Sequence, residues 1–158
     1  MILAIDIETF SDVDLKKCGV FKYVQSPAFE ILLIAYQYDD GPVEIIDLAA
    51  INDLGPDPDE IEKLDRLRAD LLDPKIIKTA YNPQFEITCL SKEFAPGLDP
   101  KQWRCTQVRA AMLGLPFGLD FVAKVLKLPV QKMSGWQHIR YFCIPCKPTA
   151  ANGMRTRN

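Results

Sequence analysis

The chain has 158 residues, of which 48% are hydrophobic and 25% are charged, and this is the composition of one ordinary globular domain. Its longest apolar run, residues 31–36, is far shorter than the roughly 20 residues of a membrane span. Acids already stand at positions 6 and 8, and no basic segment precedes them. We therefore expect neither a membrane span nor a secretory signal.

The net charge of −2 conceals an uneven distribution of charged residues. Residues 1–120 contain all 21 acids and 12 Lys or Arg, whereas residues 121–158 contain seven Lys or Arg and no acid. A basic segment of this kind can follow a phosphate backbone, or it can be a solvated tail. Charge alone leaves both interpretations open.

Five scattered cysteines are typical of a reduced, cytosolic protein and not of a disulfide scaffold. Cys143 and Cys146 form one C-x-x-C pair, which raises the alternatives of a zinc or redox site. The chain has a single histidine, His138, and the pair lies in a proline-rich segment and not in a βαβ unit. An inert pair of thiols is therefore the favoured interpretation.

The first third of the chain predicts three strands. Residues 2–7 are a short apolar run that is typical of a buried strand. Residues 11–28 predict a loop with some local structure. Residues 30–38 and 43–48 are rich in strand-forming side chains and flank the turn sequence DDGP at 39–42, so we expect an antiparallel hairpin.

A helix is predicted from Asp57 to Leu72. Asp57 suits the N-cap, Pro58 suits the first helical position, and Glu60 completes a pattern resembling a capping box. One apolar stripe runs along this helix and consists of Ile61, Leu64, Leu67 and Leu71.

The next segments predict alternating strands and helices. Residues 75–81 suit a strand, after which Asn82 as the N-cap and Pro83 as the first residue predict a helix that ends near Glu93. A short strand at 103–105 precedes two predicted helices, from Thr106 to near Gly114 and over 119–128. Together these elements predict an α/β domain with a mixed sheet. We assign its core to residues 1–130, followed by a basic, mostly irregular segment over 131–158.

Three acids are candidates for a metal site. Residues two apart on a strand share a face, so Asp6 and Glu8 project together from the first strand. Glu86 falls in the first turn of the helix that follows strand 75–81, and it approaches this pair if the two strands are parallel. Converging carboxylates suit a hard cation such as Mg²⁺ or Mn²⁺. The alternatives are solvated acids at a strand end and, for Glu86, a favourable interaction with the helix dipole.

These residues also carry a resemblance to a known family. Asp6-Ile7-Glu8-Thr9 resembles the first motif, D-x-E, of the DEDD 3′–5′ exonucleases, and Asn82-Pro83-Gln84-Phe85-Glu86 resembles their second motif, N-x-x-F-D. Over nearly its whole length the chain resembles the exonuclease domain at the N-terminus of phage and prophage family A DNA polymerases. Further similar stretches are residues 29–32, 82–90, 103–106 and 139–143.

The resemblance implies an RNase H-like α/β fold, in which a mixed sheet of about five strands is flanked by helices. It implies a proofreading exonuclease that hydrolyses 3′-terminal phosphodiester bonds of single-stranded or frayed DNA ends. The implied partner is a polymerase domain in the parent chain, and the implied location is the cytoplasm of a bacterial host. The implied cofactors are two Mg²⁺ or Mn²⁺ ions, with no small-molecule cofactor.

The resemblance also implies roles for individual residues. Asp6 would bridge both ions, Glu8 would bind the ion that activates water, and Glu86 would act partly through water. Contacts with nucleic acid are implied for Thr9, Phe10, Asn82 and Phe85. For Phe85, packing in the core is the favoured alternative.

Two departures from the family pattern limit what the resemblance implies. The second motif ends in Glu86 in place of Asp, and no third motif, Tyr-x-x-x-Asp or His-x-x-x-Asp, follows it. Residues 36–40 match the Tyr pattern literally, but they precede the second motif and end at a hairpin turn, so we reject them. The last acid in the sequence is Asp120, a weak substitute ligand. We therefore expect a fragment truncated before the third motif, with weak activity or none on its own. The alternatives are a non-catalytic nucleic-acid-binding module and an RNase H-like nuclease of other specificity.

Overall fold

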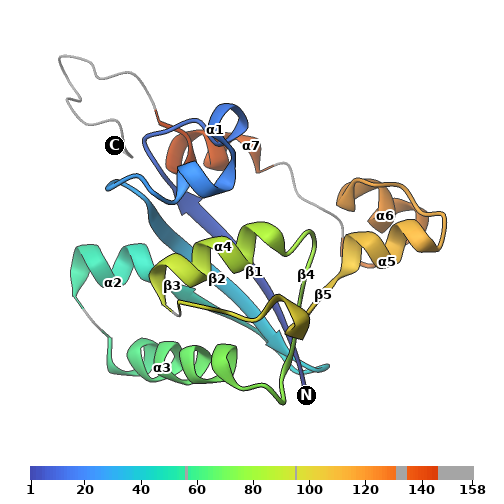
Figure 1. Cartoon of the computed structure of the whole chain (residues 1–158), viewed down its shortest axis with the longest axis horizontal. Coiled ribbons are helices and arrows are strands. Elements are labelled where there is room, and N and C mark those ends of the chain that lie inside the picture. The colour runs from blue at the N-terminus through green and yellow to red at the C-terminus, as the bar shows by residue number, and fades with distance from the viewer. Residues whose placement is uncertain (56, 95, 131–134, 146–158) are drawn as a thin grey trace.

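The computed structural model describes residues 1–158 except 56, 95, 131–134 and 146–158. Its centre is a five-stranded mixed sheet with strand order β3-β2-β1-β4-β5 (Figure 1). The predicted mixed sheet of about five strands flanked by helices is thereby confirmed. The strands are β1 (Ile2–Phe10), β2 (Glu30–Tyr38), β3 (Val43–Asp47), β4 (Ile77–Ala80) and β5 (Trp103–Cys105).

Helices surround this sheet, and several of them, including the one over residues 48–54, lie where the sequence predicted none. Residues 11–28 were expected to form a loop but contain a helix, which Asp14 caps through the backbone N–H of Lys16. Residues 136–143 were expected to be irregular but are helical. The helices are α1 (Leu15–Tyr23), α2 (Leu48–Leu54), α3 (Pro58–Leu72), α4 (Gln84–Glu93), η1 (Pro100–Gln102), α5 (Thr106–Met112), α6 (Leu119–Val125), α7 (Trp136–His138) and η2 (Ile139–Cys143).

Strand β1 lies at the centre of the sheet. It pairs antiparallel with β2 and parallel with β4, and β2 pairs antiparallel with β3, so the predicted hairpin is confirmed. The register of β1 on β2 shifts after Glu8: Glu8 lies opposite Leu33, whereas Thr9 lies opposite Ile31. The extra residue on β2 is therefore Leu32, and such a bulge increases the local twist at the end of β1.

The core lies between one face of the sheet and helices α3 and α4. Leu3, Ile5 and Ile7 of β1 are buried in it. The predicted apolar stripe of α3 supplies Leu64, Leu67 and Leu71, each of which contributes on the order of 2 kcal/mol through burial. Asp57 caps α3 as predicted, but Glu60 bonds with Lys63 at 2.9 Å, and no return bond of a capping box is found in the described residues.

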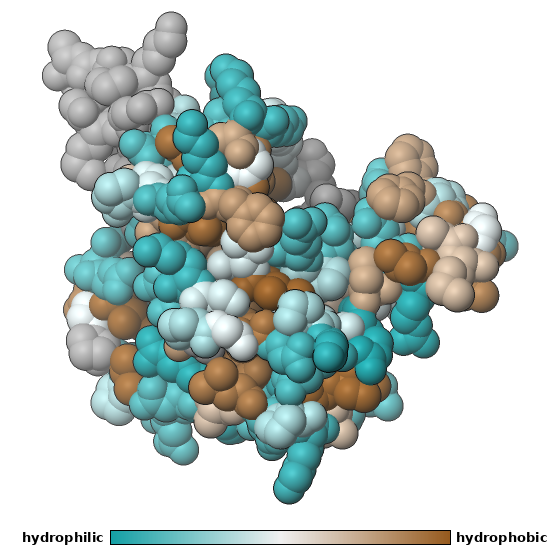
Figure 2. Space-filling model, in the orientation of Figure 1, coloured by the Kyte–Doolittle hydropathy of each residue, from teal (hydrophilic) through white to brown (hydrophobic). Residues whose placement is uncertain are grey.

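The arm formed by α5 and α6 carries a large exposed apolar surface. Figure 1 shows this arm projecting beyond the β5 side of the sheet, and apolar side chains gather over it in Figure 2. The most exposed of them are Met112, Leu113 and Phe117. No helix within the described ranges has the length and apolar character needed to cross a membrane.

The junction between β4 and α4 differs from its prediction. Asn82 was expected to be the N-cap of α4, but the N-cap is Pro83, and no side chain caps the helix. Asn82 instead has a φ of 72°, in the left-handed region that glycine and asparagine tolerate best. The left-handed backbone at Asn82 turns the chain from β4 into the first turn of α4.

This conformation predicts different stabilities for two substitutions at position 82. Asn82→Gly should leave the free energy of unfolding within a few tenths of a kcal/mol, because glycine adopts a positive φ freely. Asn82→Ala should lower it by about 1 kcal/mol, because its Cβ atom is strained there. Urea denaturation of the two variants measures the difference, and equal losses in both would contradict the backbone explanation.

Candidate functional site

The end of β1 extends beyond its pairing with β4. The pairing of β1 with β4 ends at Ala4 and Thr79, whereas β1 continues to Phe10. The open strand edge beyond this point leaves room for the first turn of α4. Asp6 and Glu8 are exposed, while Ile5 before them and Ile7 between them are buried, so the predicted shared face of the two acids is confirmed.

Glu86 is a buried carboxylate in the first turn of α4, as the sequence predicted for its position. Its side chain is only 5% exposed, and its Oε2 atom has no hydrogen-bond partner among the described residues. Burial raises the pKa of Glu86 to about 7, a backbone hydrogen bond opposes this shift, and the negative charge of Asp6 adds to it. Glu86 and Asp6 therefore influence each other, as the convergence hypothesis requires.

The chemistry of these side chains fits a hard divalent cation. Asp6, Glu8 and Glu86 offer only carboxylate oxygens, and the unpartnered Oε2 atom of Glu86 is a buried acceptor of the kind that a cation satisfies. The arrangement is nevertheless incomplete. No group of three or more His, Cys, Asp or Glu side chains in the described part of the chain is placed to hold a metal ion.

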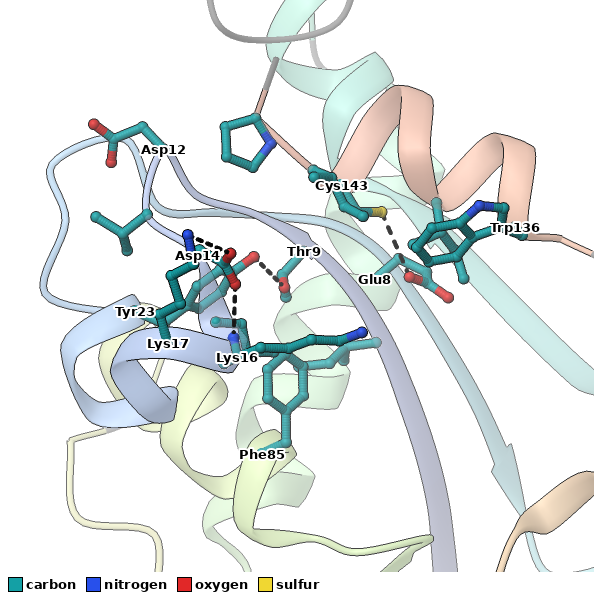
Figure 3. A pocket seen from close by; sticks show the side chains of 16 residues that line it. Glu8, Thr9, Asp12, Asp14, Lys16, Lys17, Tyr23, Phe85, Trp136 and Cys143 are labelled. Carbon is teal, nitrogen blue, oxygen red and sulfur yellow. Dashed lines mark hydrogen bonds and ion pairs between the residues drawn. The ribbon is translucent and has the colours of Figure 1, made fainter. Parts of the chain in front are cut away.

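A pocket of about 620 Å³ opens beside Glu8 (Figure 3). Its polar lining includes Glu8, Asp12 and Asp14, and two lysines lie at the start of α1. Most of its remaining lining is apolar or aromatic and comes from β1, α1, α4, α7, η2 and the segments next to α1 and η2. These apolar and aromatic residues are Ile7, Val13, Leu15, Tyr23, Phe85, Trp136, Ile139, Ile144 and Pro145.

The four residues expected to contact nucleic acid have different surroundings. Thr9 lines the pocket, and its hydroxyl group lies 3.0 Å from that of Tyr23. Phe85 also lines the pocket and packs against the core, with its ring 6.3 Å from the ring of Tyr23. Phe10 is only 1% exposed and does not line the pocket, so its burial argues against a contact with a base. Asn82 does not line the pocket either.

Tyr23 supports Thr9 from α1. Burial raises the pKa of Tyr23 to about 12, while the hydrogen bond with Thr9 opposes the shift. The phenol therefore stays protonated at neutral pH. This bond fixes the Thr9 hydroxyl group beside the pocket, one residue after Glu8.

The wall formed by α7 and η2 was missed by the sequence predictions. Trp136, Ile139 and Cys143 line the pocket from this wall, and the Cys143 thiol donates a hydrogen bond to Glu8 Oε2 at 3.6 Å. Burial raises the pKa of Cys143 to about 12, and the charge of Glu8 adds to the effect, so the thiol stays neutral. The spacing of these three residues, i, i+3 and i+7, is a helical signal that could have revealed the wall.

Two other sequence hypotheses receive no support at this site. Cys146 lies outside the described residues, so the predicted inert C-x-x-C pair remains a prediction. Asp120, the weak substitute ligand, lies in the first turn of α6 on the arm and does not line the pocket beside Glu8.

Comparison of the sequence with known proteins gives one strong similarity. Over 157 residues the chain is 56% identical to the DNA polymerase of Bacillus phage SP02. The similar region covers 99% of this chain but only 23% of that polymerase, so the chain spans about a quarter of its relative's length. No protein family model matches the sequence.

Comparison of the structure gives a consistent class of fold. A nuclease in its apo form has a TM-score of 0.58 at 22% identity, covering 86% of this chain and 56% of the nuclease. Brucella melitensis NrnC with bound Mg²⁺ has a TM-score of 0.54 at 20% identity, covering 84% and 56%. Escherichia coli RNase D, an exoribonuclease, has a TM-score of 0.51 at 18% identity, covering 86% and 30%. The fold is therefore RNase H-like, the fold of these nucleases.

The buried carboxylate of Glu86 predicts a specific dependence of stability on pH. The folded-state pKa of about 7 exceeds the ordinary value of 4.5, so folding is favoured by protonation. The stabilisation is fully present below about pH 4.5 and is lost as the pH rises through about 7. From pH 4.5 to 8, the free energy of unfolding should fall by on the order of 3 kcal/mol more in the unaltered chain than in Glu86→Gln.

Chemical denaturation in EDTA at several pH values measures this difference without interference from divalent cations. Asp40→Asn is the control, because Asp40 lies exposed in the turn between β2 and β3. It should retain the profile of the unaltered chain. Identical profiles for Glu86→Gln and the unaltered chain would contradict the raised pKa.

Proposed function

We propose that this chain is the 3′–5′ exonuclease domain of a DNA polymerase and acts on single-stranded or frayed DNA ends. The carrying observation is the buried Glu86 beside Asp6, at the open end of a β1 strand whose Glu8 faces a largely apolar pocket. The similarity to a phage DNA polymerase supports the polymerase context, and the RNase H-like fold supports a nuclease. Replication in a bacterial host cell, with proofreading as the role, is part of the same proposal.

In the proposed mechanism, Asp6 and Glu8 would hold Mg²⁺ or Mn²⁺, and Glu86 would be the third carboxylate of the site. A bound divalent cation supplies Lewis acidity, which lowers the pKa of water and neutralises phosphate charge. The chain's own residues position the substrate. Thr9 offers a hydroxyl group that Tyr23 fixes, and the aromatic face of Phe85 can stack on a base.

Cys143 has a supporting part in this proposal. Its neutral thiol donates to Glu8 and thereby restricts the orientation of the carboxylate. The apolar side chains of the same wall line the pocket beside Glu8. The α7–η2 wall thus prepares one of the proposed ligands.

The proposal includes a fourth carboxylate that is absent from this sequence. No Tyr-x-x-x-Asp or His-x-x-x-Asp follows the second motif within residues 1–158, and the polymerase that the chain resembles is much longer than the matching region. We propose that a longer polymerase chain supplies the missing acid. With only three of the four carboxylates of the site, the 158-residue chain is slow or inactive.

One observation favours a second candidate function. Because no three potential ligands in the described ranges are placed to hold a metal ion, the chain can also be a non-catalytic module that binds nucleic acid. Such a module would bind single strands without a metal requirement and with a strong dependence on salt.

The proposed chemistry is tested with the chain extended by the polymerase sequence through the expected third motif. With Mg²⁺ or Mn²⁺, the extended chain should shorten a 5′-labelled single strand stepwise from its 3′ end. Asp6→Asn should lower the rate by at least about 100-fold, because it removes a charge that holds the cation. The 158-residue chain alone should be slow or inactive.

Gel analysis of the products distinguishes the candidate functions. Asp40→Asn serves as the matched control in the extended chain and should retain the rate. Internal cuts would indicate a nuclease of other specificity. Metal-independent binding without any hydrolysis by the extended chain would support the non-catalytic module instead.

A further inference from the structure

Two neighbouring lysines at the start of α1 line the pocket beside Glu8, but their amines have different surroundings. The Lys17 Nζ atom lies 3.8 Å from Asp14, and the Lys17 side chain is 85% exposed. Lys16 bonds Asp14 through its backbone N–H at 2.9 Å, and within the described residues it is the Lys17 amine, and not the Lys16 amine, that pairs with Asp14. Figure 3 shows the Lys16 side chain extended past Phe85 into the pocket.

The acids next to Lys16 in the pocket lining, Asp12 and Asp14, interact with other groups and not with the Lys16 amine. Asp14 is engaged with α1, where it bonds the Lys16 backbone and pairs with Lys17. Asp12 accepts a hydrogen bond from Ser26. Among the described residues the Lys16 amine has no ion-pair partner within the salt-bridge distance. A cation therefore extends into a pocket that has a candidate ligand, Glu8, on another side.

The other lining suggests what this cation meets. Phe85 from α4 and Trp136 from α7 both line the pocket, so the Lys16 amine enters a space with aromatic side chains on two elements. Aromatic faces and a nearby positive charge are the two features by which proteins hold single-stranded nucleic acid. Lysine acts on phosphate as a flexible point charge, which does not require a fixed bidentate geometry.

We propose that Lys16 binds a backbone phosphate of the single strand whose 3′ end lies at Glu8. This inference rests on the proposed function and adds to it a residue that neither sequence motif contains. Lys16 acts in substrate binding and positioning, whereas Lys17 forms an ion pair with Asp14, the N-cap residue of α1. The adjacent lysines thus form a matched pair with the same charge and different tasks.

The first experiment compares Lys16→Gln with Lys17→Gln. Binding of a short, fluorescent single-stranded oligothymidylate is measured by anisotropy in Ca²⁺, which replaces Mg²⁺ so that hydrolysis does not interfere. Lys16→Gln should raise the Kd by about 3- to 10-fold and reduce the salt slope by about 0.7, the value for one phosphate contact on a single strand. Lys17→Gln should change the Kd by less than about twofold.

A second experiment locates the phosphate. Methylphosphonate groups replace the phosphates of the oligonucleotide one at a time, and each oligonucleotide is bound to the unaltered chain and to Lys16→Gln. At one position near the 3′ end, the neutral group should weaken binding to the unaltered chain but cause little further loss in Lys16→Gln. Such non-additivity identifies a direct pair.

The outcomes separate this inference from the proposed function. If the unaltered chain binds the oligonucleotide but the two lysine variants lose equal affinity, the specific task of Lys16 is refuted and the proposed function stands. Additive losses at every methylphosphonate position would also refute the direct contact. If the unaltered chain does not bind single-stranded DNA at all, the proposed function fails together with the inference.

Discussion

The alternation of side chains along β1 is the constraint on which the rest of the structure depends. Leu3, Ile5 and Ile7 must point into the core beneath α3 and α4, and the period of two then forces Asp6 and Glu8 to the opposite face. A shift of one residue would bury the acids and expose the core side chains. The same hydrophobic burial that stabilises the sheet therefore also positions the two acids.

The burial of Glu86 adds an electrostatic cost to this arrangement. The ionised form of Glu86 is unfavourable, because one carboxylate oxygen has no hydrogen-bond partner among the described residues and the negative charge of Asp6 is nearby. Proteins concentrate such perturbed groups at functional sites, because a bound cation or a proton resolves the conflict. The burial of ionised Glu86 near Asp6 thus destabilises the chain without a ligand and favours the binding of a cation. This supports the carboxylates as a site.

Local patterns predicted those elements whose formation depends mainly on residues close together in the sequence. The DDGP turn fixed the β2–β3 hairpin because two strand-forming segments flank it closely, and the apolar stripe with its Asp57 cap fixed α3. The parallel pairing of β1 and β4 was only a condition in the sequence predictions, and the structure supplies it. The helices α1 and α2 and the α7–η2 wall were missed, because their short, mixed sequences become helical only where the tertiary packing supports them.

For the candidate site, the sequence by itself determined which acids share a face and that Glu86 lies in the first turn of α4, since strand and helix periods are local properties. Only the tertiary structure decided that Glu86 is buried, that Asn82 turns the chain in a left-handed conformation, and that Cys143 reaches Glu8 across 135 residues. Burial and long-range contact depend on which elements meet in space. The direction of the Lys16 side chain likewise depends on the elements around the pocket, because the helix alone does not fix the rotamer of an exposed lysine.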